Sequence, residues 1–205
     1  MNFTYFYLLF LIGSTIYRIR RIIRSYSHEP SPGRVSFPPT YAILLFLYLA
    51  VWVGAIFEYF YFTYILQVKE INLAVSLIGL SMYLGVIPLR KWAINALGKQ
   101  LSSDIKIAED HRLIKEGPYR YVRHPLIICV TAEVFALALI PNSYYSFLVA
   151  LFGFMPFMIF RAHLEEKALT EEFGEEYLNY KKEVYGFLPL KKVRKWDADL
   201  LDKSG

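Results

Sequence analysis

Long apolar runs constrain this chain more than any other feature. Residues 40–66 and 71–89 carry at most one charge each, and they approach or exceed the ~20 residues with which an apolar helix spans a bilayer. Residues 3–17 form a shorter run, which the arginines after it can extend by snorkelling to the membrane surface. Hydrophobic residues make up 56% of the 205 residues, above the roughly 45–50% of soluble domains. The runs predict an all-α integral membrane protein without a separate soluble domain.

The second half of the chain holds two further apolar runs and a charged helical pattern. Residues 126–140 and 144–160 flank Pro141-Asn142-Ser143, which predicts a helical hairpin. Residues 161–185 carry apolar side chains at helical spacing among charges, a pattern typical of an amphipathic surface helix, and Gly174 is a plausible break in it. We therefore expect about five transmembrane helices, the last two forming the hairpin, followed by a C-terminal amphipathic helix.

Basic residues follow the first and third runs, and they orient the predicted bundle. They are Arg18, Arg20, Arg21, Arg24 and Arg34 after the first run, and Arg90 and Lys91 after the third. Since cytoplasmic loops carry an excess of Lys and Arg, five spans place the N-terminus outside and the C-terminus in the cytosol. The membrane would be the cell membrane in a prokaryote and the endoplasmic reticulum in a eukaryote. The net charge is +5, but the placement of the basic residues matters more than the size of this charge, and we expect no nucleic-acid partner.

A polar stretch between the third and fourth runs, residues 111–125, has the sequence H-R-L-I-K-E-G-P-Y-R-Y-V-R-H-P. Gly117-Pro118 and His124-Pro125 predict a shaped loop, because glycine allows a positive φ and proline fixes φ near −65°. Pro125 suits the first position of the next helix. A rigid polar loop at a membrane surface that ends in a histidine is more typical of a functional site than of a linker.

Several polar side chains are candidates for chemistry. His111, His124 and His163 match no common zinc spacing, and Cys129 is the one cysteine, so we expect no metal site and no internal disulfide. Arg161 and Glu165 share a helix face beside Glu166, where they form either a solvated charged turn or a fixed guanidinium beside a carboxylate.

Two acidic residues and two tyrosines leave further alternatives open. Glu58 and Glu133 lie inside apolar runs, where an ionisable group is a functional candidate by default, although a hydrogen-bonded or interfacial glutamate would also fit. Tyr119 and Tyr121 can attract a sulfonium or ammonium group, or belong to the interfacial aromatic belt.

Three segments together resemble one enzyme family. Residues 111–125, the R-A-H-L-E-E that begins at Arg161, and E-E-F-G-E-E-Y-L-N-Y-K-K-E-V-Y-G-F-L-P follow each other in the order and spacing of the isoprenylcysteine carboxyl methyltransferase family and its phospholipid methyltransferase relatives. The resemblance covers roughly residues 97–189. The apolar runs and the resemblance together lead us to expect one domain over residues 1–205, with three N-terminal spans in 1–91, a catalytic region with the hairpin in 92–189, and a tail in 190–205.

The resemblance also implies an S-adenosylmethionine site roofed by the cytosolic segments. Glu165 would hold the amino group of this cofactor, and Arg161 would bind the acceptor, so these two are the implied catalytic residues. The family usually has Tyr where Ile127 stands, which weakens the assignment there. The residues implied to line the cofactor are His111, Arg112, Leu113, Ile114, Tyr119, His124, Pro125, Leu126 and Ile127.

Methyl transfer to a lipidic acceptor is the function that the resemblance implies, with the carboxylate of a prenylated cysteine as the leading acceptor. A carboxylate is already ionised near pH 7 and needs no general base. An amine acceptor, as in phospholipid N-methylation, must lose a proton, for which Glu58 or Glu133 would be attractive. An NADPH-dependent sterol-reductase-like enzyme and a non-catalytic membrane scaffold are further alternatives. The scaffold alternative is disfavoured because a scaffold has no need of four residues that the sequence retains, namely Arg161, Glu165, Tyr119 and His124.

Overall fold

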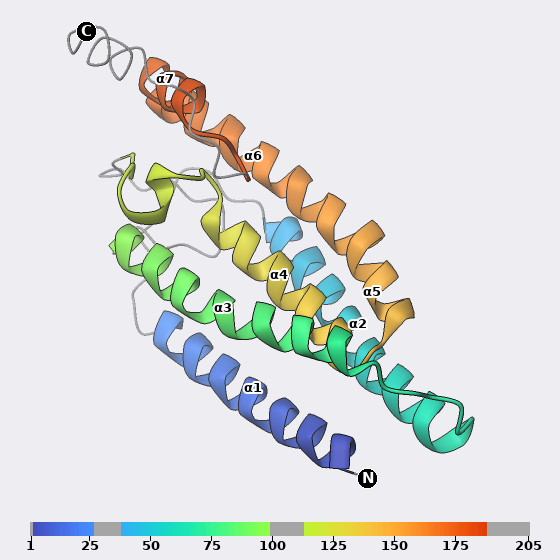
Figure 1. Cartoon of the computed structure of the whole chain (residues 1–205). Coiled ribbons are helices and arrows are strands. Elements are labelled where there is room, and N and C mark those ends of the chain that lie inside the picture. Colours follow the sequence, from blue (N-terminus) through green and yellow to red (C-terminus); the bar gives the residue numbers. More distant parts are fainter. Residues whose placement is uncertain (1, 27–37, 99–112, 188–205) are drawn as a thin grey trace, which may run out of the picture.

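The structure is a computed structural model of the whole chain, and it describes residues 2–26, 38–98 and 113–187 (Figure 1). These residues are all helical apart from short connections. The α-helices are α1 (Asn2–Tyr26), α2 (Pro38–Phe60), α3 (Leu73–Leu97), α4 (Pro125–Leu139), α5 (Tyr144–Val149), α6 (Met155–Phe173) and α7 (Glu175–Glu183). A π-helical turn, Tyr61–Ile65, extends α2, and another, Ala150–Phe154, joins α5 to α6.

Three helices of the described part are long and apolar enough to cross a membrane, namely Thr40–Ile65, Leu73–Leu97 and the continuous Tyr144–Phe173. This finding agrees with the predicted all-α integral membrane protein. Helix α4 is apolar but has only 15 residues, and α1 is less apolar because its second half carries arginines. The count of five transmembrane helices stays a prediction.

The helices of the first and third apolar runs extend beyond the ends that the sequence predicts. The first apolar run ends at residue 17 in the sequence, but α1 continues to Tyr26, so Arg18 and Arg20 are helical. Helix α3 likewise runs past Arg90 to Leu97 instead of ending at residue 89. The physical reason is that Arg18 and Arg90 are both buried and face the bundle, so neither marks the point where its helix leaves the membrane.

The hairpin between α4 and α5 is confirmed, and it is tied to the rest of the bundle by buried polar side chains. Asn142 adopts a positive φ of 56°. Its side chain accepts from the backbone N–H of Asn72 at 2.7 Å and donates to Ser76 at 2.7 Å. Ser143 donates to the carbonyl of Ala55 at 2.8 Å. The turn is therefore fixed to both α2 and α3.

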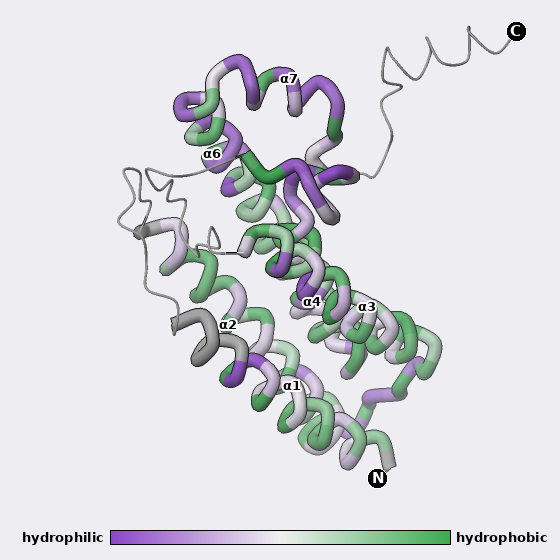
Figure 2. The backbone as a smooth tube through the Cα atoms, turned by 90° about the vertical axis from the view of Figure 1, so that its left-hand side faces the viewer, coloured by the Kyte–Doolittle hydropathy of each residue, from purple (hydrophilic) through white to green (hydrophobic). Residues whose placement is uncertain are grey.

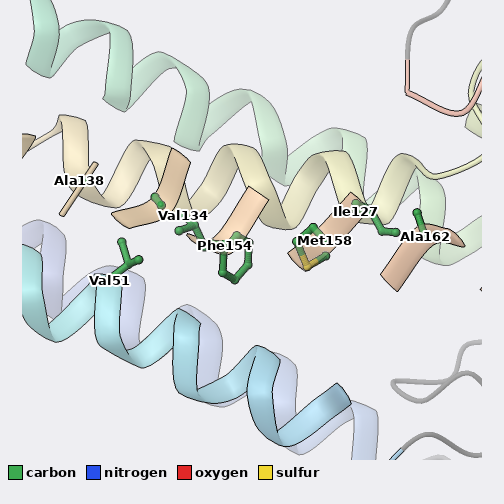
Figure 3. Packing of buried hydrophobic residues seen from close by; sticks show 8 residues of the cluster. Val51, Ile127, Val134, Ala138, Phe154, Met158 and Ala162 are labelled. Carbon is green, nitrogen blue, oxygen red and sulfur yellow. The ribbon is translucent and has the colours of Figure 1, made fainter. Parts of the chain in front are cut away.

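Helices α2, α4 and α6 share one core. Val51 of α2 lies opposite Val134 and Ala138 of α4, and Phe154 and Met158 contribute from the long C-terminal helix (Figure 3). A second cluster, formed by Tyr7, Tyr59, Tyr83, Ala136, Leu137 and Ile140, holds α1 against α2, α3 and α4. Helices α3 and α4 pack closely, since a Cβ on Gly79 would lie 2.9 Å from the backbone nitrogen of Ile140.

Polar residues gather at one end of the bundle. In Figure 2 the hydrophilic stretches lie over α7, the end of α6 and the segment before α4, while the helices away from this end are mostly hydrophobic. The break expected in the C-terminal helix is confirmed at Gly174, which has a φ of 52° and separates α6 from α7. The end of α3 and the start of α2 and of α4 lie at this same polar end (Figure 1).

Candidate active site

The predicted loop before α4 is a packed structure. Gly117 has a φ of 60°, and residues Gly117–Arg120 form a 3-10 turn. A Cβ on Gly117 would lie 2.9 Å from the Cβ of Ala96 and 3.2 Å from Nε1 of Trp92, so only glycine lets the loop sit this close to α3. The turn buries Tyr119, which is 9% exposed. Pro125 starts α4, as predicted.

The segment after α7 closes over this loop. The backbone N–H of Arg123 donates to the carbonyl of Tyr185 at 2.9 Å, and that of His124 donates to Gly186 at 3.1 Å. The hydroxyl of Tyr180 donates to the carbonyl of Tyr119 at 2.6 Å. These bonds hold α7 and its C-terminal extension against the residues that lead into α4.

Glu166 is the centre of a compact charge network. Arg123 donates to its Oε1 through Nε at 3.0 Å and through Nη2 at 2.5 Å. His124 Nε2 lies 3.1 Å from the same oxygen, and Lys181 donates to Oε2 at 2.6 Å. Through Nη1, Arg123 also donates to the carbonyls of Lys181 and Val184. Because the Glu166 side chain is only 12% exposed, this network joins the loop, α6 and α7 into one unit.

His124 is charged in this surrounding. The residue is 3% exposed, and its ring is tilted by 33° against that of Phe187, with ring centroids 5.5 Å apart. Burial lowers the pKa of the imidazole, but the carboxylates of Glu165 and Glu166 outweigh burial and raise this pKa to about 9. Nδ1 lies 3.6 Å from Oε2 of Glu165 and has no hydrogen-bond partner within residues 113–187 or the other described segments. A buried N–H donor that has an ion-pair partner at 3.6 Å but no hydrogen bond in the described part of the chain is a candidate to bind a ligand.

Arg161 lies one turn before Glu165 on α6 and is 8% exposed. Its Nη1 donates to the hydroxyl of Thr40, near the start of α2, at 3.1 Å. The guanidinium is thus held inside the helix bundle below the loop, and not splayed onto the membrane surface as the solvated-turn alternative would have it.

The other residues implied as cofactor contacts fall into three groups. His111 and Arg112 lie outside the described residues. Leu113 packs against the cluster of Tyr177, Tyr180 and Val184, and Ile127 packs in the core with Met158 and Ala162. Pro125 is buried, whereas Ile114 and Leu126 are half-buried. No contact of these residues with a cofactor is tested, so their roles stay predictions.

Sequence reasoning missed the part that Arg123, Glu166 and Lys181 play in holding the site. Glu166 was noticed only as the neighbour of Glu165, and Lys181 as one charge of an amphipathic helix. The single available signal was the adjacency of Arg123 to His124-Pro125, since an arginine placed there can reach whatever carboxylate packs over the helix start. Nothing in the spacing indicated that this carboxylate would be 43 positions away.

The two acidic residues in the apolar runs have structural partners. Glu58 accepts from the backbone N–H groups of Tyr145 and Ser146 at 3.1 and 2.9 Å, and from the Ser146 hydroxyl at 2.8 Å. It thus stabilises the start of the long C-terminal helix, far from the loop. Glu133 forms ion pairs with Arg18 and Arg90. His163 is exposed and donates to the carbonyl of Ile159 at 2.8 Å.

Comparison with known proteins shows which family the chain resembles. Residues 77–171 match the model of the isoprenylcysteine carboxyl methyltransferase (ICMT) family, and this region holds α4, the hairpin, the loop, Arg161 and Glu165. The predicted resemblance to the ICMT family is confirmed. Within the described residues, no group of three His, Cys, Asp or Glu side chains is placed to hold a metal ion.

Several of the curated relatives are named protein-S-isoprenylcysteine O-methyltransferase. A probable protein-S-isoprenylcysteine O-methyltransferase of Oryza sativa subsp. indica is 34% identical over 122 residues, which are 56% of this chain and 61% of the relative. The protein-S-isoprenylcysteine O-methyltransferase of Saccharomyces cerevisiae is 31% identical over 97 residues, 46% of this chain and 41% of the relative. The uncharacterized protein YpbQ of Bacillus subtilis is 29% identical over 92 residues, 44% of this chain and 54% of the relative. The chain thus spans about half the length of the curated relatives it matches.

Proposed function

We propose that this protein is an S-adenosylmethionine-dependent membrane methyltransferase that methylates the carboxylate of a lipidic acceptor, with a prenylated cysteine as the leading candidate. The observation that carries the proposal is the pairing of a half-exposed Glu165 with a buried, charged His124 at the mouth of the ICMT-like region, one turn above a buried Arg161. The names of the relatives supply the acceptor class.

The residues present fit the cofactor. S-adenosylmethionine has an ammonium, a carboxylate and a sulfonium group, and it supplies an electrophilic methyl group when bound. The Glu165 carboxylate, 41% exposed on its side chain, is available for the ammonium. The Nδ1–H of His124, which has no hydrogen bond within the described residues, can donate to the carboxylate of the cofactor. Tyr119 would lie close to the sulfonium, since aromatic rings attract cations.

Arg161 would position the acceptor. Its planar guanidinium can hold a carboxylate in a fork, and the bond to Thr40 fixes the direction of the side chain. The surrounding helices exclude water, which removes the hydration that weakens a carboxylate as a nucleophile. Positioning of this kind supplies most of what an in-line displacement requires, so the chain needs no general base for a carboxylate acceptor.

The engagement of both membrane glutamates disfavours the amine-acceptor alternative. Glu58 is held by the start of the C-terminal helix. Glu133 is held between the guanidinium groups of Arg18 and Arg90, with which it forms ion pairs. Neither is available as the base that N-methylation requires, whereas O-methylation of a carboxylate requires none.

The proposal includes the membrane arrangement. Five transmembrane helices, α1 to α4 and the long helix that ends in α6, would place the polar end of the bundle in the cytosol, where S-adenosylmethionine is available. The single domain would then be organised as expected, with the catalytic region in the second half of the chain.

The test is a labelling experiment. The purified full chain is incubated with methyl-labelled S-adenosylmethionine and N-acetyl-S-farnesylcysteine, and in parallel with a total lipid extract. We expect a base-labile methyl ester on the farnesylcysteine or on an acidic lipid, and no product with Arg161→Ala. Label on an amine would replace the O-methyl proposal by N-methylation. The absence of any labelled product, together with no measurable affinity for S-adenosylmethionine, would refute the methyltransferase proposal.

A further inference from the structure

A second charged cluster lies inside the helix bundle, and the proposed reaction does not use it. Glu133 of α4 is 1% exposed. Its Oε1 accepts from Nε of Arg18 in α1 at 3.2 Å and from the hydroxyl of Tyr48 in α2 at 3.0 Å. Its Oε2 pairs with Arg90 of α3. Four helices thus each send one polar side chain to the same point.

The described side chains of this cluster are not balanced in charge. Two guanidinium groups, 8% and 3% exposed, face one carboxylate. An unbalanced charge in a membrane protein is costly, and such groups mark ligand or ion sites by default. The aromatic rings of Tyr48 and Trp52 lie 4.9 and 5.5 Å from the Arg18 guanidinium carbon. This contact offsets part of the cost but does not neutralise the charge.

The cluster also has unused hydrogen-bond donors. Nη2 of Arg18, Nη2 of Arg90, Nε1 of Trp52 and the hydroxyl of Tyr83 are buried without a hydrogen-bond partner in the part of the chain that the structure describes. Tyr83 precedes Arg90 by two turns on the same face of α3, within electrostatic range of Glu133 and Arg18. Buried donors are normally satisfied. A surplus of donors together with a surplus of positive charge indicates an anionic oxygen ligand.

The depth of the cluster limits which anions can reach it. Arg18 lies eight residues before the end of α1 and Glu133 eight residues after the start of α4, or about 12 Å inside at 1.5 Å per residue. The branched head group of a phospholipid stays at the membrane surface. A single-chain lipid acid can slide its carboxylate to this depth with its chain between the helices and the bilayer.

We propose that Arg18, Arg90 and Glu133 form a binding site for the carboxylate of a single-chain lipid acid. Glu133 holds the two guanidinium groups in place, and their remaining N–H groups bind the ligand. The site is separate from Arg161, because the α2 partners of the two sites, Thr40 and Tyr48, are eight residues and thus about 12 Å apart along the helix. The inference goes beyond the proposed methyl transfer and does not depend on it.

The test measures binding of radiolabelled palmitate to the full chain in phosphatidylcholine nanodiscs, with hexadecanol as the uncharged control. Arg18→Gln and Arg90→Gln each remove a positive donor and are expected to weaken palmitate binding about tenfold or more. Glu133→Gln removes the competing negative charge and is expected to strengthen it. Lys182→Gln, which removes an exposed positive charge, is the matched control without effect.

The arginine variants are expected to weaken palmitate binding and Glu133→Gln is expected to strengthen it. Misfolding would weaken binding in every variant, so it cannot produce this pattern. Tyr83→Phe adds a mild change that removes one donor and no charge, with an expected loss of about twofold to tenfold. Equal palmitate binding by the parent, Arg18→Gln and Arg90→Gln would overturn the site. Weaker binding by a Glu133→Gln variant that unfolds as cooperatively as the parent, or equal affinity of the parent for palmitate and hexadecanol, would do the same.

A competition arm distinguishes two sources of the carboxylate. If N-acetyl-S-farnesylcysteine displaces palmitate, the site also binds the carboxylate of a prenylated cysteine, in addition to any binding at Arg161. If it does not, while palmitate binding still follows the charge series, the ligand is a free fatty acid of the membrane. If the protein transfers no methyl group, the expected palmitate affinities of the parent and the variants stay the same. The two proposals are therefore tested separately.

Discussion

At the scale of single residues, two glutamates that are adjacent in the sequence have different surroundings. Glu166 is held by Arg123, His124 and Lys181, whereas Glu165 keeps 41% of its side chain exposed. Glu165→Gln should therefore weaken S-adenosylmethionine affinity about ten- to a hundredfold, from the loss of a charge-assisted bond of roughly 1.5–3 kcal/mol, with little change in stability. Glu166→Gln should lower the unfolding free energy by about 1–3 kcal/mol. Calorimetric titration and thermal unfolding measure the two effects.

Arg161 should differ from Glu165 in the step that it affects. Arg161→Lys keeps the positive charge but loses the planar fork, so turnover should fall while S-adenosylmethionine affinity stays near that of the parent. A merely structural ion pair at the surface would be worth about 0–1 kcal/mol and would leave turnover unchanged. Parallel measurements of S-adenosylmethionine affinity and of the initial rate distinguish acceptor positioning by Arg161 from a structural ion pair. Parent-like turnover by both Arg161→Lys and Glu165→Gln would remove the pair from the site.

The charge of His124 makes stability depend on pH in a defined direction. Its pKa of about 9 lies above the ordinary value of 6.5, so the charged imidazole stabilises the folded state. That contribution, on the order of 3 kcal/mol, is fully present below pH 6.5 and is lost as the pH rises through 9. In His124→Gln, the melting temperature should therefore depend less on pH between 6.5 and 9 than it does in the parent. NMR of ¹³C-labelled histidine measures the pKa directly, and a value near 6.5 for the signal that His124→Gln removes would contradict the network.

At the scale of helices, the contact between α3 and α4 depends on Gly79. A methyl group there would meet the backbone nitrogen of Ile140 at 2.9 Å, and backbone atoms cannot move aside as a flexible side chain can. Gly79→Ala should therefore lower stability by about 1–3 kcal/mol, as overpacking does. Gly85→Ala on the same helix is the matched control, because its Cβ would meet no atom within 4 Å. It should be neutral or stabilise by up to about 1 kcal/mol, through helix propensity.

Helix starts, stops and the hairpin were predictable because their signals are local. Pro125, Gly174 and Pro141-Asn142-Ser143 each act through their own backbone, and all three mark the boundaries that the structure shows. The extent of α1 was not predictable in this way. Hydropathy treats Arg18 as a polar residue that ends a span, but Arg18 is buried because Glu133 lies opposite it, 115 positions along the chain. The charge network around Glu166 was missed for the same reason, since its partners meet only after the helices pack.

At the scale of the whole molecule, the structure changes where the proposed orientation is best tested. Residue 142 lies in the hairpin turn expected outside the membrane, but Asn142 is 1% exposed and its side chain bonds to Asn72 and Ser76. Val68, in the connection between α2 and α3 at the same end of the bundle, is 65% exposed. Lys182 of α7 is exposed at the opposite, polar end.

These two positions give the topology prediction its experiment. Single cysteines replace Val68 and Lys182 in a Cys129→Ala background, where the natural thiol is buried in any case. With the N-terminus outside and the C-terminus in the cytosol, a membrane-impermeant maleimide added to intact cells should label position 68. It should reach position 182 only after the membrane is opened. This measurement is needed because Arg18 and Arg90 are buried in the bundle. They therefore do not contribute to the excess of basic residues in cytoplasmic loops from which the orientation is predicted. External labelling at 182 would reverse the orientation and place the proposed cofactor site on the side of the membrane that lacks S-adenosylmethionine.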